Sequence, residues 1–484
     1  MVKNKKITKT KSQNEALQKL DLFLKKPINV QDINSYVFLM KGKAGTGKTT
    51  IVYYALEKKI LDDQRTIDKD SSPDFFAFPN VVGVALSHTA KNVLSKSIHV
   101  CATFASCYGL KQKFHDDGSI TFEKPKWRNK MLSILGESPV GVFVHDEVST
   151  YDQGMLDHVL EFTGKHSKII FMGDPGQSPP ITGKADLDDD KDSPVFYLDL
   201  LESNVHTLTE RVRQTEDNPI IELSDIIYEE IFGNKDMLRV YNAMKNDNII
   251  NGKGHKTICY KDFLSDFESL ATNYTQTKVI AYTNVRVNML NSIIRKRIYK
   301  NSDFPYLEGE LIYMKDSYSH KILAGAKTVL TKWICYNSDE YKILRVTKSK
   351  VDEVNVYNLY LDKTGHMHLS QYKDPYIPVV CESGKFEFNK TKNQLHYFAS
   401  IETLNKGYKY KVLNDFVQKF SNISYGYCYT TYKIQGRGYK NIYIDVNNIL
   451  TVTKLSPKRK LQAIYTGLTR ATDLAVFLKA NQND

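Results

Sequence analysis

One short segment constrains the fold of this chain more than any other. Residues 42–49 read Gly-Lys-Ala-Gly-Thr-Gly-Lys-Thr, a G-x-x-x-x-G-K-T pattern. Its glycines let the backbone curl closely around an anion, and the amides of the curl and of a following helix then point at a phosphate group. An apolar run at 36–40 precedes the segment and a helical pattern at 50–59 follows it. We therefore expect a strand, a phosphate-binding loop and a helix in that order.

The residues of this segment have distinct expected parts in binding ATP with Mg²⁺. The ammonium of Lys48 can reach the β- and γ-phosphates, and the hydroxyl of Thr49 can bind the magnesium ion. Further contacts to the nucleotide are expected from the rest of the loop and the first helical residues, namely Gly42, Ala44, Gly45, Thr46, Gly47 and Thr50.

Short apolar runs of strand length recur along the chain, with helical patterns between them. They lie at 36–40, 81–86, 140–144, 168–172, 278–282 and 441–445. Near-continuous apolar strands that alternate with helices are typical of a parallel sheet covered on both faces. The last two runs start the same pattern again, so we predict an α/β protein with two parallel-sheet domains.

These patterns also predict where the domains lie. The first domain is expected to span 1–204, and the second combines 205–310 with 421–484. Residues 311–420 are richer in short β-type runs, and they are predicted to form a β-rich insertion that includes a small barrel.

A smaller insertion is expected inside the first domain. Asp117-Gly118 lies between two β-capable stretches, which predicts a β-hairpin near 108–130. An ordinary surface hairpin is the alternative to a functional one.

The charge and the cysteines bear on the partner and the compartment. A formal net charge of +12 with a pI of about 9.0 favours a polyanionic partner, although lysines that only aid solubility are the alternative. The six cysteines are scattered without a C-x-x-C pair, which argues against a zinc site or a disulfide framework. No apolar run is long enough to span a bilayer, and no signal peptide is recognised. We expect a soluble, intracellular protein with no membrane partner.

Two further strand ends carry side chains suited to hydrolysis. The run at 140–144 leads into Asp146 and Glu147; beside a phosphate loop, Asp146 can hold Mg²⁺ through water and Glu147 can orient and deprotonate the attacking water. The run at 168–172 leads into Gly-Asp-Pro-Gly-Gln at 173–177. The Gln177 amide can hydrogen-bond both a γ-phosphate oxygen and a water, although such a segment can also form a plain turn.

The order of these motifs, followed by Thr469-Arg470-Ala471, resembles that of superfamily 1 helicases. The stretch Ala281-Tyr282-Thr283-Asn284 makes the resemblance closest to the Dda-like and RecD-like branch, and the likeness runs from Gln13 to about Phe477. The resemblance implies two RecA-like domains that hydrolyse ATP and move 5′ to 3′ on single-stranded DNA. It also makes the hairpin at Asp117-Gly118 the pin that separates the strands.

The resemblance assigns further residues to the nucleotide. It places Gln13 near the adenine, and Gln435 and Gly436 in the nucleotide site. Arg213 is expected at the γ-phosphate and Arg470 is expected to be the arginine finger. Lys48, Glu147, Gln177, Arg213 and Arg470 are thus the predicted catalytic residues. For either arginine by itself, a surface ion pair is the commoner role.

The expected DNA contacts are hydroxyl groups and aromatic rings. Hydroxyls that donate to phosphates position a strand without reading its sequence, and local capping is the alternative. Rings near the hairpin can stack on bases. The candidates are His88, Thr89, Thr103, Phe122, Trp127 and Thr430. The sequence departs from the family pattern at Ala105, Tyr432 and Gly438, positions that serve DNA contact and coupling rather than hydrolysis.

The function predicted from these observations is that of an ATP-dependent DNA helicase. Its expected partners are single-stranded and forked DNA, together with a single-strand-binding or replication protein, and the chain is expected to be a monomer in replication, recombination or repair. The alternative is a DNA-stimulated ATPase that remodels nucleoprotein without unwinding. A structural subunit with an inactive nucleotide site is a third reading, and Lys48, Glu147, Gln177 and Arg470 argue against it. A composition rich in Lys, Asn and Tyr favours an AT-rich, phage-like source.

Overall fold

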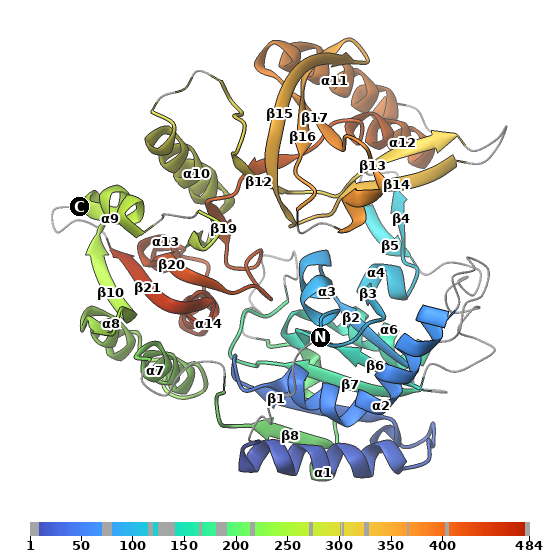
Figure 1. Cartoon of the computed structure of the whole chain (residues 1–484), viewed down its shortest axis with the longest axis vertical. Helices are drawn as coiled ribbons and strands as arrows, with labels where there is room; N and C mark the ends of the chain where they lie inside the picture. The colour runs from blue at the N-terminus through green and yellow to red at the C-terminus, as the bar shows by residue number, and fades with distance from the viewer. Residues whose placement is uncertain are drawn as a thin grey trace. The chain divides into compact units, whose positions relative to one another are not determined.

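The arrangement of the chain was taken from a computed structural model (Figure 1). It describes residues 9–69, 80–114, 120–123, 141–163, 167–180, 191–212, 218–270, 274–300, 302, 304–323, 329–364, 367–401 and 406–479. The chain divides into two units. Unit one combines residues 1–107, 128–286 and 429–484, and unit two combines residues 108–127 and 287–428.

The first sheet of unit one has six parallel strands in the order β3-β2-β6-β7-β1-β8. The strands are β1 (Val37–Gly42), β2 (Val81–Ala85), β3 (Cys101–Thr103), β6 (Val142–His145), β7 (Lys168–Gly173) and β8 (Val205–Leu208). The helices of this part are α1 (Lys11–Lys25), α2 (Lys48–Lys69), α3 (His88–Leu94), α4 (Phe104–Cys107) and α6 (Gln153–Thr163). In Figure 1, α1 runs along β8 at one edge of the sheet.

The central strands of this sheet are buried on both faces. Every residue of β2, β6 and β7 is buried. Phe38 and Met40 of β1 pack with residues of α1 and α2, whereas the rings of His145 and Phe171 contact Tyr151 at centroid distances of 5.9 and 6.5 Å. Burial on both faces is why these strands read as continuous apolar runs, and the predicted sheet is confirmed.

The second sheet of unit one has the order β19-β11-β20-β21-β10-β9. Strands β11, β20, β21 and β10 pair in parallel, and β9 is antiparallel to β10. The strands are β9 (Asn248–Ile250), β10 (Lys253–Cys259), β11 (Thr277–Ala281), β19 (Cys428–Thr430), β20 (Tyr439–Asp445) and β21 (Ala471–Lys479). The helices are α7 (Ile220–Phe232), α8 (Met237–Lys245), α9 (Phe263–Leu270), α13 (Val446–Thr451) and α14 (Pro457–Leu468). Helix α10 (Asn284–Ile298) begins in this unit and belongs mostly to unit two. The predicted second parallel sheet is confirmed.

Strand β8 belongs to the first sheet although it lies beyond the predicted end of the first domain. It pairs with β1, with Leu39 opposite Val205 and Gly42 opposite Leu208. The first sheet therefore extends past residue 204, where the sequence placed the end of the first domain. The remaining predicted limits stay predictions.

Unit two contains a five-stranded antiparallel sheet in the order β17-β16-β15-β12-β18. Its strands are β12 (Leu311–Met314), β15 (Glu340–Val351), β16 (Val354–Leu361), β17 (Tyr376–Val380) and β18 (Ile423–Tyr425). The described residues of this unit also form two hairpins, β4 (Lys111–Phe114) with β5 (Ile120–Glu123) and β13 (Tyr318–Leu323) with β14 (Val329–Cys335). The hairpin β4–β5 was predicted, and its Asp117-Gly118 turn lies outside the described residues.

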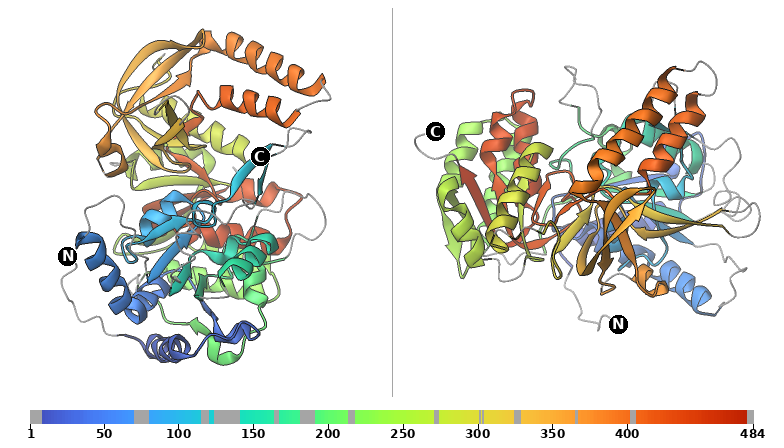
Figure 2. Two further views of the ribbon diagram at one scale, coloured as in Figure 1. Left: turned by 90° about the vertical axis from the view of Figure 1, so that its right-hand side faces the viewer. Right: turned by 90° about the horizontal axis from the view of Figure 1, so that it is seen from above.

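Two helices in unit two were not predicted. Helices α11 (Lys385–Ile401) and α12 (Lys406–Val417) lie side by side in Figures 1 and 2. They pack through Phe388, Phe416 and Phe420 against Val354 and Val356. This segment shows no clear helical period because large apolar side chains also point outward, with Phe386 73% exposed and Tyr397 66% exposed. The insertion is thus β-rich only in part.

No helix in the part of the chain that the structure describes combines the length and the apolar character needed to cross a bilayer.

Candidate nucleotide-binding site

The predicted phosphate loop joins β1 to α2 and has the expected local geometry. Gly45 and Gly47 adopt positive φ angles of 84° and 88°, which side-chain-bearing residues rarely adopt. A Cβ atom on Gly42 would lie 2.8 Å from Thr46 Oγ1. The ammonium of Lys48 folds back over the loop and donates to the carbonyl oxygens of Gly42 at 2.7 Å and Lys43 at 3.2 Å. The curl that the glycines predicted is therefore present, with Ala44 inside it and Thr49 and Thr50 in the first turn of α2.

Gln13, which is expected near the adenine, lies against this loop. It stands in the first turn of α1, where it forms a capping box with Thr10. Its Nε2 donates to the carbonyl oxygen of Thr46 at 3.0 Å. A Cβ atom on Gly47 would lie 3.0 Å from the same nitrogen. The glycine is needed both for its backbone angle and for this close approach.

The two predicted acids follow β6 directly. The amide of Asp146 donates to the Val84 carbonyl at 3.0 Å, and the amide of Glu147 donates to Asp146 Oδ1 at 2.9 Å. Glu147 has φ 55° and ψ 40°. This left-handed conformation costs a non-glycine residue about 1–3 kcal/mol. Strained residues of this kind cluster at functional sites, and in this chain they also occur elsewhere, for example at Asn251 and Asp352.

A buried histidine supports the strand behind these acids. His145 Nδ1 lies 3.1 Å from the Tyr151 hydroxyl. Complete burial lowers the pKa of His145 to about 3, because a charged imidazole would lose its hydration. His145 is therefore neutral at physiological pH and adds no charge to the site.

Gln177 connects the acid to the predicted arginine finger. With its amide oriented to satisfy its neighbours, Gln177 Nε2 donates to Glu147 Oε2 at 3.2 Å, and its Oε1 accepts from Arg470 Nη2 at 3.0 Å. Arg470 is 5% exposed, and its Nε donates to the Thr466 carbonyl at 3.2 Å. Glu147 and Gln177 follow strands of the first sheet, whereas Arg470 precedes β21 of the second. Three predicted catalytic residues thus meet, although nearly 300 positions separate Gln177 from Arg470.

Helix α14 and the segment around Gln435 hold the loop that carries Gln177 in place. Tyr465 donates its hydroxyl to Asp174 Oδ2 at 2.9 Å, and the Ser178 amide donates to Thr466 Oγ1 at 2.9 Å. Gln435 Nε2 donates to the Ser178 carbonyl at 3.2 Å. The loop that carries Gln177 follows a strand of the first sheet, and these bonds join it, across the seam between the two sheets of unit one, to segments of the second sheet.

The segment that carries Gly436 lies beside helix α3, which carries Thr89. Gly436 has a positive φ of 74°, and a Cβ atom there would lie 3.4 Å from the Cβ atom of Ala90 in α3. Arg437 Nη2 donates to Thr89 Oγ1 at 2.9 Å. His88 begins the same helix α3. Two of the residues predicted to contact DNA thus lie where α3 meets the Gln435 segment.

The other threonines predicted to contact DNA make local bonds. Thr103 Oγ1 accepts from the Ser106 amide at 3.3 Å, and Thr430 Oγ1 accepts from the Lys433 amide at 3.3 Å. These bonds match the capping alternative. A hydroxyl that accepts still has its own proton to donate, so a role at a phosphate stays a prediction.

Three predicted site residues are described only in part or not at all. Arg213 and Trp127 lie outside the described residues. Phe122 belongs to β5, but its side chain is not described. Their roles stay predictions.

The donors expected for magnesium fit that ion. Thr49 supplies a hydroxyl and Asp146 a carboxylate, and Mg²⁺ prefers one or two such oxygens completed by water and phosphate oxygens. Among the described residues, no group of three His, Cys, Asp or Glu side chains could hold a metal ion by itself. A metal held mainly by nucleotide phosphates agrees with this donor set.

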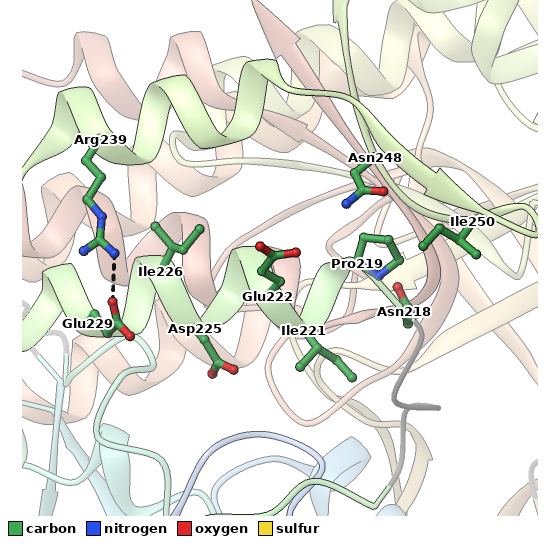
Figure 3. Close-up of a pocket in the computed structure, with 10 residues that line it drawn as sticks. All are labelled: Asn218, Pro219, Ile221, Glu222, Asp225, Ile226, Glu229, Arg239, Asn248 and Ile250. Atoms are coloured by element: carbon green, nitrogen blue, oxygen red, sulfur yellow. Dashed lines mark hydrogen bonds and ion pairs between the residues drawn. The ribbon is translucent and has the colours of Figure 1, made fainter.

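The sequence did not identify residues of α7 that reach the site. Asp225 of α7 pairs with Lys43 in the phosphate loop. A groove of about 650 Å³ lies beside this helix, and its lining includes Asp225, Glu222, Arg239 and Ile250 but not Lys48 or Glu147 (Figure 3). No local pattern marks Asp225, because it lies more than 180 residues from its partner.

Comparisons with known proteins found one matching family and several relatives. A family described as an AAA domain matches residues 30–243. Uncharacterized protein R530 of Acanthamoeba polyphaga mimivirus is 22% identical over 504 residues, which cover 91% of this chain and 95% of that protein. The ATP-dependent DNA helicase dda of Enterobacteria phage T4 is 26% identical over 287 residues, 57% of this chain and 56% of that protein. RecBCD enzyme subunit RecD of Buchnera aphidicola subsp. Schizaphis graminum is 28% identical over 181 residues, 34% of this chain and 28% of that protein.

Solved structures of Pif1 helicases also match the chain. The Candida albicans Pif1 helicase has a TM-score of 0.45 at 13% identity and covers 99% of this chain and 96% of that chain. A Bacteroides Pif1 helicase in complex with ADP-AlF3 and ssDNA has a TM-score of 0.44 at 12% identity and covers 97% of this chain and 92% of that chain.

Proposed function

We propose that this chain, a superfamily 1 helicase of the Dda and RecD type, uses ATP hydrolysis to move 5′ to 3′ along single-stranded DNA and to separate duplex DNA. The observation that carries the proposal is the bridge from Glu147 through Gln177 to Arg470. It joins the predicted base of one sheet to the predicted finger of the other, at the place where a γ-phosphate would be cleaved.

The triphosphate would be held first by the phosphate loop. Lys48 donates to two carbonyl oxygens of the loop, and a bound phosphate would compete for this ammonium with charged oxygens, which are stronger acceptors. Thr49 and Asp146 would hold Mg²⁺, which neutralises charge on the β- and γ-phosphates when bound. Gln13 would contact the adenine beside the loop.

Hydrolysis requires positioning and neutralisation of charge more than covalent chemistry. Glu147 would orient and deprotonate the attacking water. Gln177 would exchange its present partners for the γ-phosphate and that water, and would thereby report whether the phosphate is present. Arg470, together with Arg213, would stabilise the charge that develops on the transferred group.

Cleavage would be coupled to movement through the seam of unit one. Tyr465, Thr466 and Gln435 bond to the loop on either side of Gln177. A change at the γ-phosphate would therefore alter contacts between the two sheets, and a strand held across both would be gripped alternately. His88, Thr89, Thr103 and Thr430 would position its phosphates.

The proposed partners follow from this cycle. They are single-stranded and forked DNA, with a single-strand-binding or replication protein as a further partner, and the enzyme would act as a monomer in replication, recombination or repair. The relative dda of Enterobacteria phage T4 supports DNA as the nucleic acid, because it is a DNA helicase.

An unwinding assay with both polarities tests the proposal. Forked duplexes with a labelled strand and either a 5′ or a 3′ loading tail are incubated with enzyme, ATP and Mg²⁺. We expect opening of the 5′-tailed fork only, and no opening by Lys48→Ala. Opening of the 3′-tailed fork alone would overturn the direction. DNA-stimulated ATP turnover that opens neither fork would instead support a remodelling ATPase.

A further inference from the structure

Helix α7 contributes one carboxylate that two cations of the nucleotide site share. Asp225 Oδ1 accepts from Lys43 Nζ of the phosphate loop and from Arg211 Nη2, the latter at 2.9 Å. Arg211 Nη1 also donates to the Ile221 carbonyl in the first turn of α7 at 3.1 Å. The Arg211 side chain is 8% exposed, against 25% for Lys43 and 40% for Asp225. A single carboxylate therefore joins the helix to the loop.

Arg211 belongs to a short segment that touches three parts of the site. On one side of it, Glu210 Oε2 accepts from the Ser12 amide at the start of α1 at 3.2 Å. On the other side, the Val212 amide donates to the Gly45 carbonyl in the phosphate loop at 3.0 Å. Residues 210–212 thus tie together the helix that carries Gln13, the phosphate loop and, through Arg211, helix α7.

The next turn of α7 reaches the loop that carries Gln177. The ring of Tyr228 lies 4.6 Å from Lys43 Nζ, and its centroid lies 5.6 Å from that of Tyr465. A Cβ atom on Gly176 would lie only 2.7 Å from the Tyr228 ring. One face of α7, with Asp225 and Tyr228, thus contacts both loops that are expected to meet the γ-phosphate.

The charges explain why the carboxylate matters. Lys43 and Arg211 converge on a single oxygen, so they lie close together and repel each other unless a negative charge lies between them. Without that charge, Lys43 loses its ion pair with α7 and keeps the weaker contact with the Tyr228 ring, so the phosphate loop is held less firmly against this helix. The carbonyl of Lys43 also accepts from Lys48 and Thr46, so a shift of Lys43 moves the groups that shape the curl.

We propose that Asp225 is a positioning residue for ATP binding, which holds the phosphate loop through Lys43, and the 210–212 segment through Arg211, in the form that accepts a triphosphate. The proposal rests on the proposed nucleotide site and adds a residue outside its motifs. Asp225 touches no reacting atom in this assignment. Its effect is therefore expected on the affinity for ATP more than on the rate of cleavage.

The test replaces Asp225 by asparagine, which keeps the shape and removes the charge. Glu229→Gln is the matched control, because Glu229 lies one turn further along α7, pairs with Arg239 at 2.9 Å and loses the same charge. In Figure 3 Asp225 points away from α8, whereas Glu229 lies beneath Arg239. The readouts are KM and kcat for ATP and the Kd of the full chain for a fluorescent ATP analogue.

We expect Asp225→Asn to raise KM and Kd about 10-fold with kcat changed less than about 3-fold, and Glu229→Gln to change neither. Asp225→Glu should recover most of the affinity, because the carboxylate is restored. Lys43→Met combined with Asp225→Asn should bind no more weakly than the weaker single variant, since both changes break one interaction.

Three results would overturn the proposal. The first is an unchanged Kd in Asp225→Asn, and the second is an equal loss in Glu229→Gln. The third is a failure of Asp225→Glu to recover affinity while its thermal unfolding matches that of the wild type. Because the Kd needs no DNA, a wild-type protein that binds the analogue but opens no fork would refute the helicase function and leave this test valid.

Discussion

The two parallel sheets of unit one share a plan but end their corresponding strands differently. In the first sheet, β1 runs into a glycine-rich curl before α2. In the second, β11 runs directly into α10, and the amides of Tyr282 and Thr283 donate to Asn448 Oδ1 at 2.9 and 3.1 Å. The amides that could have faced an anion are thus satisfied by a side chain of the protein itself.

This difference shows how one architecture serves two tasks. A strand followed by a helix directs amides and a positive helix end toward the carboxyl edge of a sheet. The first sheet leaves that edge for phosphate, whereas the second occupies it with Asn448. The second sheet instead contributes Arg470 across the seam. In the proposed cycle, binding and sensing of the nucleotide are therefore divided between two similar sheets.

The largest expected effect tests the contribution of the second sheet. Arg470→Ala should lower ATP turnover by about 10³-fold or more, because the proposed finger would stabilise the charge that develops on the transferred phosphate. Steady-state ATPase assays measure this, with nucleotide binding measured in parallel. Arg459→Ala is the control, because Arg459 lies in α14 and donates to the Lys191 carbonyl at 2.7 Å. Normal turnover in Arg470→Ala would remove the finger assignment.

A second test removes the side chain that closes the edge of the second sheet. Asn448→Ala leaves the amides of Tyr282 and Thr283 without their acceptor, and we expect the free energy of unfolding to fall by about 2 kcal/mol. Urea denaturation measures this loss, and the affinity for ATP should not change. Asn447→Ala is the control, since Asn447 is the exposed neighbour on α13. A comparable loss in the control would contradict the role of Asn448.

A third test fills the curl of the first sheet. Gly47→Ala adds a Cβ atom to a residue with φ +88° and 3.0 Å from Gln13 Nε2, so the affinity for ATP should fall about 10-fold. Gly252→Ala is the control, because Gly252 has φ +76° with nothing within 4 Å of the added atom. The control should lose about 1 kcal/mol of stability and no affinity. Titration with a fluorescent nucleotide distinguishes the two outcomes.

The smallest expected effect is a loss of folding stability at acidic pH. His145 has its pKa lowered from 6.5 to about 3 by burial, so between these values the unfolded chain binds a proton that the folded chain does not. Stability is therefore lost as pH falls below 6.5, by about 1.4 kcal/mol per pH unit. Urea unfolding at pH 7.5 and 5.5 measures the slope, which His145→Phe should reduce. An unchanged slope in that variant would assign the acid sensitivity elsewhere, for example to His255 of the second sheet, whose pKa burial also lowers.

Much of the fold was predictable because its signals are local. The runs at 81–86 and 168–172 became β2 (Val81–Ala85) and β7 (Lys168–Gly173) with shifts of one residue. Strands buried on both faces need apolar side chains at nearly every position, and a glycine-rich curl needs its glycines within a few residues of each other. Helices α11 and α12 were missed because outward aromatic side chains such as Phe386 obscure the helical period.

Other features became visible only in the tertiary structure. Lys168 begins a buried strand, and its ammonium donates to the carbonyls of Phe23, Lys26 and Ser35 at 2.9, 2.6 and 2.5 Å. A buried charge is tolerated only where such acceptors converge, and these come from segments more than 130 residues away. No pattern within the strand reveals them.

The sequence by itself determined the phosphate loop, the acids after β6 and the alternation that makes two parallel sheets, because each depends on neighbours within a few residues. The tertiary structure alone decided that Gln177 would bridge Glu147 and Arg470, and that Asp225 would join Lys43 to Arg211. Those contacts depend on how segments that are far apart in the sequence pack together. The sequence around a charged or amide side chain does not reveal which distant residue will be its hydrogen-bond partner.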